Sequence, residues 1–435
     1  MTRFLHYVLF VLHTKGIIGA VLRIGMIIAR FDFRGKKMND VVSSINQLGI
    51  KYNFKPAMIV PAVVLQRHKG LLKYATNSNL EFAIHGHTHK NHRPWSLEKQ
   101  KTEVVKAKVV FDDLGMPYCG FRAPYLSCNS ETDDALEMSG MLWNSDQGIM
   151  WNHNNGQLPK HRHYMEKAIQ FLYSPADSDK TLAIPRMHGQ MVCIPLVFPD
   201  DEILIDRFGI KNPDRIAQIW NNILDQTNAR GDVFVLQLHP ERFCFCQKAM
   251  DALLDVIVKS DKCIWVTDMY EIAKWWKERS EFNFIIVEQS EKCFEIQCEC
   301  SDRATILTKN VPDMTVQFHH GYQQVSKKSF NLTTKGSRPC VGIHPQCPPA
   351  LHKFLKELGF AHQLSESDSD YSVFFDKHET YSLEEEVSIL HRIEQCDQPL
   401  LRFWLWPNHY ESAFTTSHDL DCITLTDFVY RALGQ

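Results

Sequence analysis

Apolar residues along the first two thirds of the chain recur in two alternating patterns. Short runs of consecutive apolar residues predict buried strands, and longer segments with apolar residues three or four positions apart predict amphipathic helices. Strands that alternate with helices indicate a parallel α/β architecture. The predicted strands are residues 24–31, 56–60, 80–84, 118–122, 141–145 and 233–239, and the predicted helices are residues 38–48, 96–114, 130–139 and 212–227.

The pattern changes after residue 278. Short alternating strands at residues 283–288, 293–298, 304–308 and 316–319 indicate a small β-rich module, and mixed helices and strands follow it. The chain ends in a strand-like run and a predicted helix at residues 426–433. We therefore predict an apolar N-terminal segment (1–23), an α/β domain (24–278), a β-rich module (279–345) and an α+β region (346–435).

Composition places the protein among ordinary globular proteins. Hydrophobic residues make up 44% of the 435 residues, charged residues make up 23%, and the formal net charge is −3. The absence of a basic excess argues against nucleic acid as a partner. The thirteen cysteines are odd in number and contain no C-x-x-C pair, which favours free thiols in a reducing cytoplasm.

The N-terminal segment is apolar but short. Residues 4–12 and 17–29 are each too short to span a bilayer, and no clear signal-peptide cleavage site follows the first run. We expect a cytoplasmic protein whose N-terminal segment packs on the domain or makes a peripheral contact with a membrane surface.

The first candidate for chemistry is His85-Gly86-His87-Thr88-His89, directly after the strand predicted at 80–84. Imidazoles four positions apart project from one helical face, and neutral imidazole is a good ligand for zinc. His87 points away from that face, so it is a weaker ligand candidate. Taken alone, the motif fits either a metal-binding pair or a histidine-rich surface turn.

Four further segments decide between these interpretations. They are Arg30-Phe31-Asp32-Phe33-Arg34, Phe121-Arg122-Ala123-Pro124-Tyr125, Trp143-Asn144-Ser145-Asp146 and Leu236-Gln237-Leu238-His239. With the histidine motif they resemble the polysaccharide deacetylase (NodB-homology, carbohydrate esterase family 4-like) family over residues 20–275. The resemblance implies a distorted (β/α)7 barrel of the TIM type, with the site at the C-terminal ends of its strands.

The resemblance also implies a reaction, the hydrolysis of an N-acetyl group with a divalent metal ion. Zn²⁺ is the expected ion, and Co²⁺ and Ni²⁺ are alternatives. The roles implied for matching residues are metal binding by His85 and His89, retention of the catalytic carboxylate by Arg122, donation to the oxyanion by the backbone N–H of Tyr125, general acid catalysis by His239 and orientation of that histidine by Asp146.

The first motif departs from the family pattern, which has two adjacent aspartates. Phe33 follows Asp32, and a phenyl ring cannot bind a metal. Asp32 is therefore the base in one register and the metal ligand in the other. The site is then completed by water, completed by a carboxylate from elsewhere such as Asp419 or Asp421, or inactive.

The second of these outcomes draws on Asp419-Leu420-Asp421, which resembles the Asp-x-Asp first motif of some domains of the family. Three interpretations of this segment remain open: a strand that packs against the first domain, the beginning of a second domain, and a structural segment with exposed carboxylates.

We expect a metal-dependent hydrolase that removes N-acetyl groups from a sugar, an oligosaccharide, or a lipid- or nucleotide-linked glycan precursor. Two alternatives remain. One is a carbohydrate-binding relative without catalysis, and the other is a hydrolase of non-sugar amides, such as ureides, on the same fold.

Overall fold

The structure, a computed structural model, describes residues 25, 27–74, 78–151, 175–311, 316–334, 336–371 and 373–434. The predicted apolar segment at residues 1–23, and with it the predicted membrane contact, lies outside the described residues. None of the described helices is long and apolar enough to cross a membrane.

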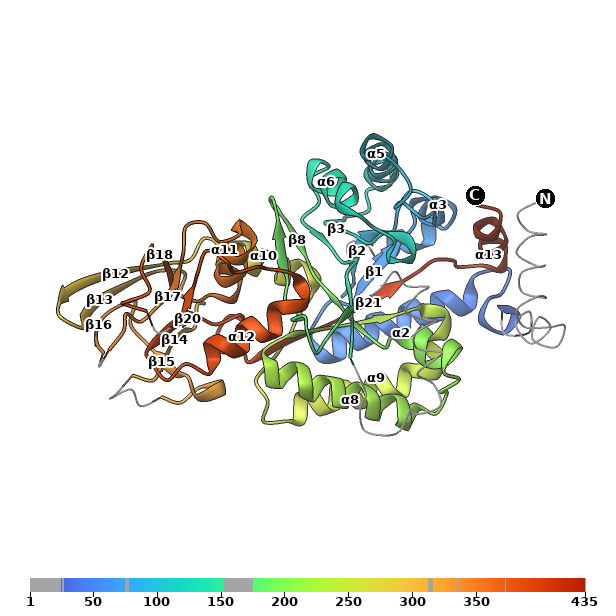
Figure 1. Cartoon of the computed structure of the whole chain (residues 1–435). Helices are drawn as coiled ribbons and strands as arrows, with labels where there is room; N and C mark the ends of the chain where they lie inside the picture. Colours follow the sequence, from blue (N-terminus) through green and yellow to red (C-terminus); the bar gives the residue numbers. More distant parts are fainter. Residues whose placement is uncertain are drawn as a thin grey trace.

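Parallel strands of the first two thirds of the chain, together with β21 from near its end, form a curled sheet (Figure 1), and their pairing closes it into a ring. Two extended segments each contribute two successive strands, β4 with β5 and β8 with β9, and these segments pair with each other. The predicted α/β, barrel-like fold class is confirmed. In spatial order the ring contains β21 (Ser412–Asp419), β1 (Ala57–Val60), β2 (Glu81–Ile84), β3 (Gly120–Phe121), β4 (Trp143–Asn144) with β5 (Gly148–Met150), β8 (Met191–Cys193) with β9 (Leu196–Phe198), and β10 (Val233–Leu238), which pairs with β21 again.

Helices cover the outside of this ring because each has one apolar face. In α8, for example, Ile216, Ile219, Trp220 and Ile223 are buried, and they recur at helical spacing. Figure 1 shows α2, α8 and α9 on one side of the strands and α3, α5 and α6 on the other. The helices are α2 (Lys36–Tyr52), α3 (Ala62–Arg67), α5 (Leu97–Asp113), α6 (Ser130–Met138), α8 (Pro213–Arg230), α9 (Phe243–Lys259) and α10 (Met269–Ser280). Short strands at the margins are β6 (Ala176–Asp177), β7 (Arg186–His188) and β11 (Ile264–Val266).

The strand predicted at residues 24–31 is wrong for the part that the structure describes. Residues 27–30 are helical, and Ile28 is exposed. The place between β1 and β10 is taken by β21, from the far end of the chain. An apolar run can form a buried strand only where a neighbouring strand has free backbone groups, and here β21 has already paired with them.

The region between α10 and β21 forms three small sheets beside the ring (Figure 1). Two are antiparallel and one is parallel. Their members are β12 (Asn283–Ser290), β13 (Cys293–Glu299) and β16 (Ser329–Thr333); β15 (Gln323–Val325), β14 (Ile306–Lys309) and β20 (Leu400–Phe403); and β18 (His362–Leu364), β17 (Val341–Ile343) and β19 (Phe374–Phe375), with helices α11 (Pro349–Leu358) and α12 (Glu386–Glu394).

The last helix, α13 (Leu425–Ala432), is held by a buried carboxylate. Asp427 forms a capping box with Thr424, the N-cap residue, and lies 2.5 Å from Nε2 of His68. Burial alone would raise the pKa of Asp427, but its hydrogen bonds to His68 and Thr424 lower the pKa to about 2. The segment after β21 is thereby fixed to the N-terminal half of the chain.

We expect Asp427→Asn to destabilise the fold at pH 7 by about 2 kcal/mol, because the pKa of this carboxyl is depressed in the folded state. The stabilisation is complete above the usual pKa, near 3.8, and is lost as the pH falls toward 2. Urea unfolding of wild type and variant at pH 7 and at pH 3 measures the difference. The exposed Glu366→Gln is the control, and an equal deficit for Asp427→Asn at both pH values would contradict the prediction.

Candidate metal centre

The ring brings three chain segments together at one end. Asp419 is the last residue of β21, His85 follows β2 and His239 follows β10. These strands are parallel, so their C-terminal ends lie at the same edge. Side chains separated by more than three hundred positions in the sequence therefore share one site.

Asp421, His85 and His89 converge on one point. Oδ1 of Asp421 lies 3.3 Å from Nε2 of His85 and 3.2 Å from Nε2 of His89. Ligand atoms bound to one zinc ion at about 2.1 Å are separated from each other by roughly 3.0–3.4 Å. The spacing of these atoms therefore fits a divalent ion.

The hydrogen bonds of the histidines support the same interpretation. Nδ1 of His85 lies 2.8 Å from the carbonyl oxygen of Arg122, so this nitrogen carries the proton in the neutral ring. In that neutral form, Nε2 of His85 presents a lone pair to Asp421. Oδ1 of Asp421 has no well-aligned hydrogen-bond donor among the described residues. A divalent ion bound between these atoms would satisfy the carboxylate oxygen and both ring nitrogens.

The pKa values of His85, Asp421 and His89 are all shifted by burial and by the charges around them. Burial alone would lower the pKa of His85, but the charges of Asp419 and Asp421 outweigh it and raise the pKa. Burial would raise the pKa of Asp421, but Arg431 and the two histidines hold it well below its usual value. The pKa of His89 is lowered to about 4, mainly by burial. Asp421 is thus ionised and His89 neutral, as metal ligands must be.

Asp419 lies beside this cluster and is held from two sides. Nη1 of Arg122 donates to Oδ1 of Asp419 at 2.7 Å, and Nε2 of Gln237 donates to Oδ2 at 2.7 Å. Oδ2 is also 3.9 Å from Nε2 of His85. Burial would raise the pKa of Asp419, but the charge of Arg122 lowers it, so the carboxylate stays ionised.

Arg122 is itself fully buried, and its orientation is fixed. Its Nε donates to the carbonyl oxygen of Ser145 at 2.9 Å, and its Nη2 donates to the Ser145 hydroxyl at 3.0 Å. The guanidinium therefore points at Asp419 without freedom to rotate away.

His239 is paired with Asp201. The backbone N–H and Nδ1 of His239 each lie 2.7 Å from one of the two oxygens of Asp201. Burial would lower the pKa of His239, but Asp201 outweighs it and raises the pKa to about 10. The imidazole is therefore protonated at neutral pH, with Nε2 left for other contacts.

Asp146, expected to orient His239, contacts a different group. Its Oδ1 accepts the backbone N–H of Ala123 at 2.6 Å, and burial raises its pKa to about 7. It supports the loop of the Arg122 motif. The aspartate that does contact His239 is Asp201. Its only signal in the sequence is the pair Asp200-Asp201, almost forty positions before His239.

Asp32 is not part of the cluster either. Its carboxylate accepts backbone N–H groups at the start of α2, from Arg34 at 2.7 Å and from Lys37 at 2.7 Å. Phe33 is 76% exposed. The structure instead brings Asp419 and Asp421 to the histidines. This arrangement matches one of the three outcomes left open by the sequence, in which a carboxylate from elsewhere completes the site.

Tyr125 borders the cluster. Its ring lies 4.3 Å from that of His89, and its backbone has a φ of 62°, which is rare outside glycine. Strain of this kind persists only where neighbouring structure enforces it.

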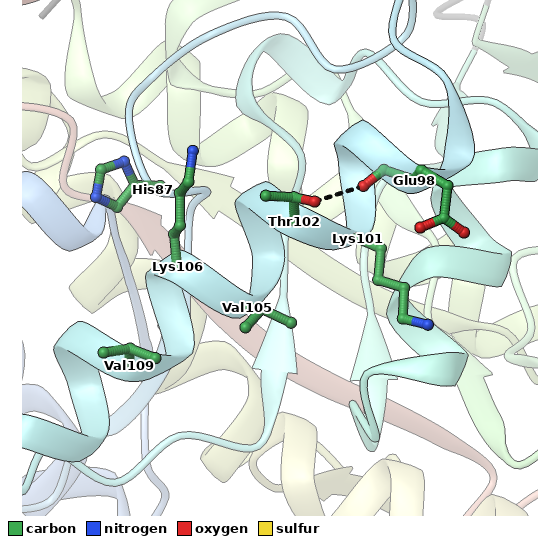
Figure 2. Close-up of a pocket in the computed structure, with 7 residues that line it drawn as sticks. All are labelled: His87, Glu98, Lys101, Thr102, Val105, Lys106 and Val109. Carbon is green, nitrogen blue, oxygen red and sulfur yellow. Dashed lines mark hydrogen bonds between the residues drawn. The ribbon is translucent and has the colours of Figure 1, made fainter.

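His87 points to another part of the surface. With side chains of α5, it lines a groove on the outside of that helix, which Figure 2 shows along Thr102, Val105, Lys106 and Val109. None of the residues that line this groove belongs to the cluster of His85, His89 and Asp421.

The comparison with protein families confirms the resemblance noted in the sequence. Residues 29–142 match the model of the polysaccharide deacetylase family, a range that includes His85, His89, Arg122 and Tyr125. The match begins just before Asp32 and contains neither His239 nor Asp419 and Asp421. It supports the predicted class, a deacetylase-type hydrolase. No curated protein sequence matches the chain.

Three solved structures resemble parts of the chain. One is described as a putative polysaccharide deacetylase from Mycobacterium smegmatis, with 18% identity, a TM-score of 0.41, and coverage of 54% of this chain and 76% of that one. A second is described as the PuuE allantoinase, with 16% identity, a TM-score of 0.41, and coverage of 54% and 72%. A family 4 carbohydrate esterase from Streptomyces lividans has 13% identity, a TM-score of 0.24, and coverage of 26% and 58%.

We expect Asp421→Asn to weaken metal binding at least about tenfold, because one of three ligand atoms loses its charge. His85→Ala and His89→Ala should have the same effect. Elemental analysis of dialysed protein measures this against wild type. Asp32→Asn is the matched control and should keep the wild-type metal content. Loss of metal from this variant would show that Asp32 is the ligand and would contradict the prediction.

Proposed function

We propose that the protein is a metal-dependent hydrolase that removes N-acetyl groups from a sugar or a carbohydrate chain. The observation that carries the proposal is the convergence of Asp421 on His85 and His89, with Asp419 and the protonated His239 at the same end of the ring. A metal-ligand set, an ionised carboxylate and a protonated imidazole are the groups that amide hydrolysis needs.

His85, His89 and Asp421 would hold the ion, with Zn²⁺ first and Co²⁺ or Ni²⁺ as alternatives. A divalent ion there supplies a Lewis acid for the amide carbonyl and lowers the pKa of a water molecule. The ligand set of two histidines and one carboxylate is typical of hydrolytic zinc sites.

Asp419 is the proposed general base. The depressed pKa keeps its carboxylate ionised, and Arg122 and Gln237 fix both oxygens beside the metal ligands. Each carboxylate oxygen has a second lone pair, so these two hydrogen bonds leave room to accept a proton from the attacking water. The backbone N–H of Tyr125 is the proposed donor to the oxyanion.

His239 is the proposed general acid. It carries a proton at neutral pH, and Asp201 fixes the ring through Nδ1. Nε2–H can then protonate the departing amine, which must leave as a neutral molecule. Asp201 replaces Asp146 as the proposed positioning residue.

The proposed substrate is an N-acetylated sugar, as a free oligosaccharide or as a lipid- or nucleotide-linked precursor. The family match at residues 29–142 supports this class. We propose a cytoplasmic location, which is supported by the thirteen cysteines that are all free in the structure.

We expect Asp419→Asn to lower kcat for deacetylation by about 10²–10⁴-fold while the metal content stays near that of wild type, because the base is lost and the ligands remain. Acetate release from a panel of N-acetylated sugars, in Zn²⁺, Co²⁺ or Ni²⁺, measures this effect. Turnover of small non-sugar amides alone would favour the ureide hydrolase, and sugar binding without turnover would favour the non-catalytic relative.

The pH profile separates Asp201 from Asp146. We expect Asp201→Asn to move the alkaline limb of kcat/KM to lower pH by about two units or more, because burial lowers the pKa of His239 and the largest charge that opposes it is then gone. Activity above pH 8 would fall first, since the acid must be protonated. Asp146→Asn should leave this limb in place; the reverse pattern would restore Asp146 to the role expected from the sequence.

A further inference from the structure

The two oxygens of Asp421 have different partners. Oδ1 faces the two histidines, whereas Oδ2 lies 2.6 Å from Nη1 of Arg431. Arg431 belongs to α13, the last helix of the chain, and its guanidinium lies 5.7 Å from the ring centre of Tyr125. The side chain of Arg431 is 25% exposed, so it stands at the rim of the site.

We propose that Arg431 is a positioning residue that restricts Asp421 to binding the metal through a single oxygen. The inference rests on the proposed metal centre. A free carboxylate can bind an ion through one oxygen or through both. The ion pair with Arg431 occupies Oδ2, and the positive guanidinium repels a divalent cation that approaches this oxygen.

This restriction matters because the ion needs an open position. A catalytic zinc site has three protein ligands and leaves the next position to water or substrate. Nε2 of His85, Nε2 of His89 and Oδ1 of Asp421 supply three ligand atoms. If Oδ2 also bound the ion, it would occupy the space that the reacting groups require.

The chain offers a matched control for damage to α13. Arg67 lies 3.6 Å from Asp427 and stacks 4.5 Å from the ring centre of Tyr430, so it anchors the same helix. Both of these contacts are made to residues of α13, and neither is made to the cluster of His85, His89 and Asp421. Arg67→Gln loosens the helix without changing the partner of Asp421.

The test uses the full-length protein loaded with Co²⁺, whose visible absorption reports coordination number. Arg431→Gln should lose absorption intensity, because a second oxygen enters the coordination sphere. A chelator competition should show Co²⁺ bound at least about tenfold more tightly, because a nearby positive charge is gone. Arg431→Lys, which keeps a cation at Oδ2, and Arg67→Gln should both resemble wild type.

The outcomes separate this inference from the proposed function. If wild type takes up no Co²⁺, the metal centre itself is refuted, and the role of Arg431 with it. If Co²⁺ binds through His85 and His89, the inference is overturned by an unchanged spectrum or weaker binding in Arg431→Gln, by a failure of Arg431→Lys to resemble wild type, or by the same spectral change in Arg67→Gln.

Discussion

The insertion of β21 between β1 and β10 is the constraint on which the rest of the structure depends. Every residue of β21 is buried, and its backbone pairs with strands on both sides. A buried strand cannot leave these groups unpaired, so its position and register are tightly specified. The same register places Asp419 opposite Arg122 and sends Asp421 to the histidines.

The route of the chain into β21 is fixed by α10 and the small sheets. Arg279 donates to the carbonyl oxygens of Trp404 and Phe403, and Nε1 of Trp275 donates to that of Leu405. These contacts hold the connection that leads from β20 to β21. Helix α10 thus anchors the end of β20 and the residues that follow it, from which the chain continues to β21.

Charge balance governs the buried end of the ring. Asp419 is matched by Arg122, and Asp201 by His239. Asp421 is shared between Arg431 and two histidines that present lone pairs to it. Oδ1 of Asp421 faces Nε2 of both histidines, and a divalent ion bound between these three atoms would satisfy them. The proposed metal centre is thus supported by the charges around it as well as by the spacing of its ligand atoms.

The amino-acid sequence by itself determined the local features. Most of the strands and helices could be predicted from periodicity, and the His85–His89 pair from its spacing, because each depends on neighbouring residues. Arg122 and His239 were named because their short motifs resemble those of the family. The choice among Asp32, Asp419 and Asp421, and between Asp146 and Asp201, could not be predicted, and the predicted domain boundaries stay predictions. Asp32 follows an apolar run, as a first-motif aspartate should, yet the run is helical where the structure describes it. Only the tertiary structure decided which segment pairs between β1 and β10, because that competition involves backbone groups hundreds of positions apart, which no local pattern records.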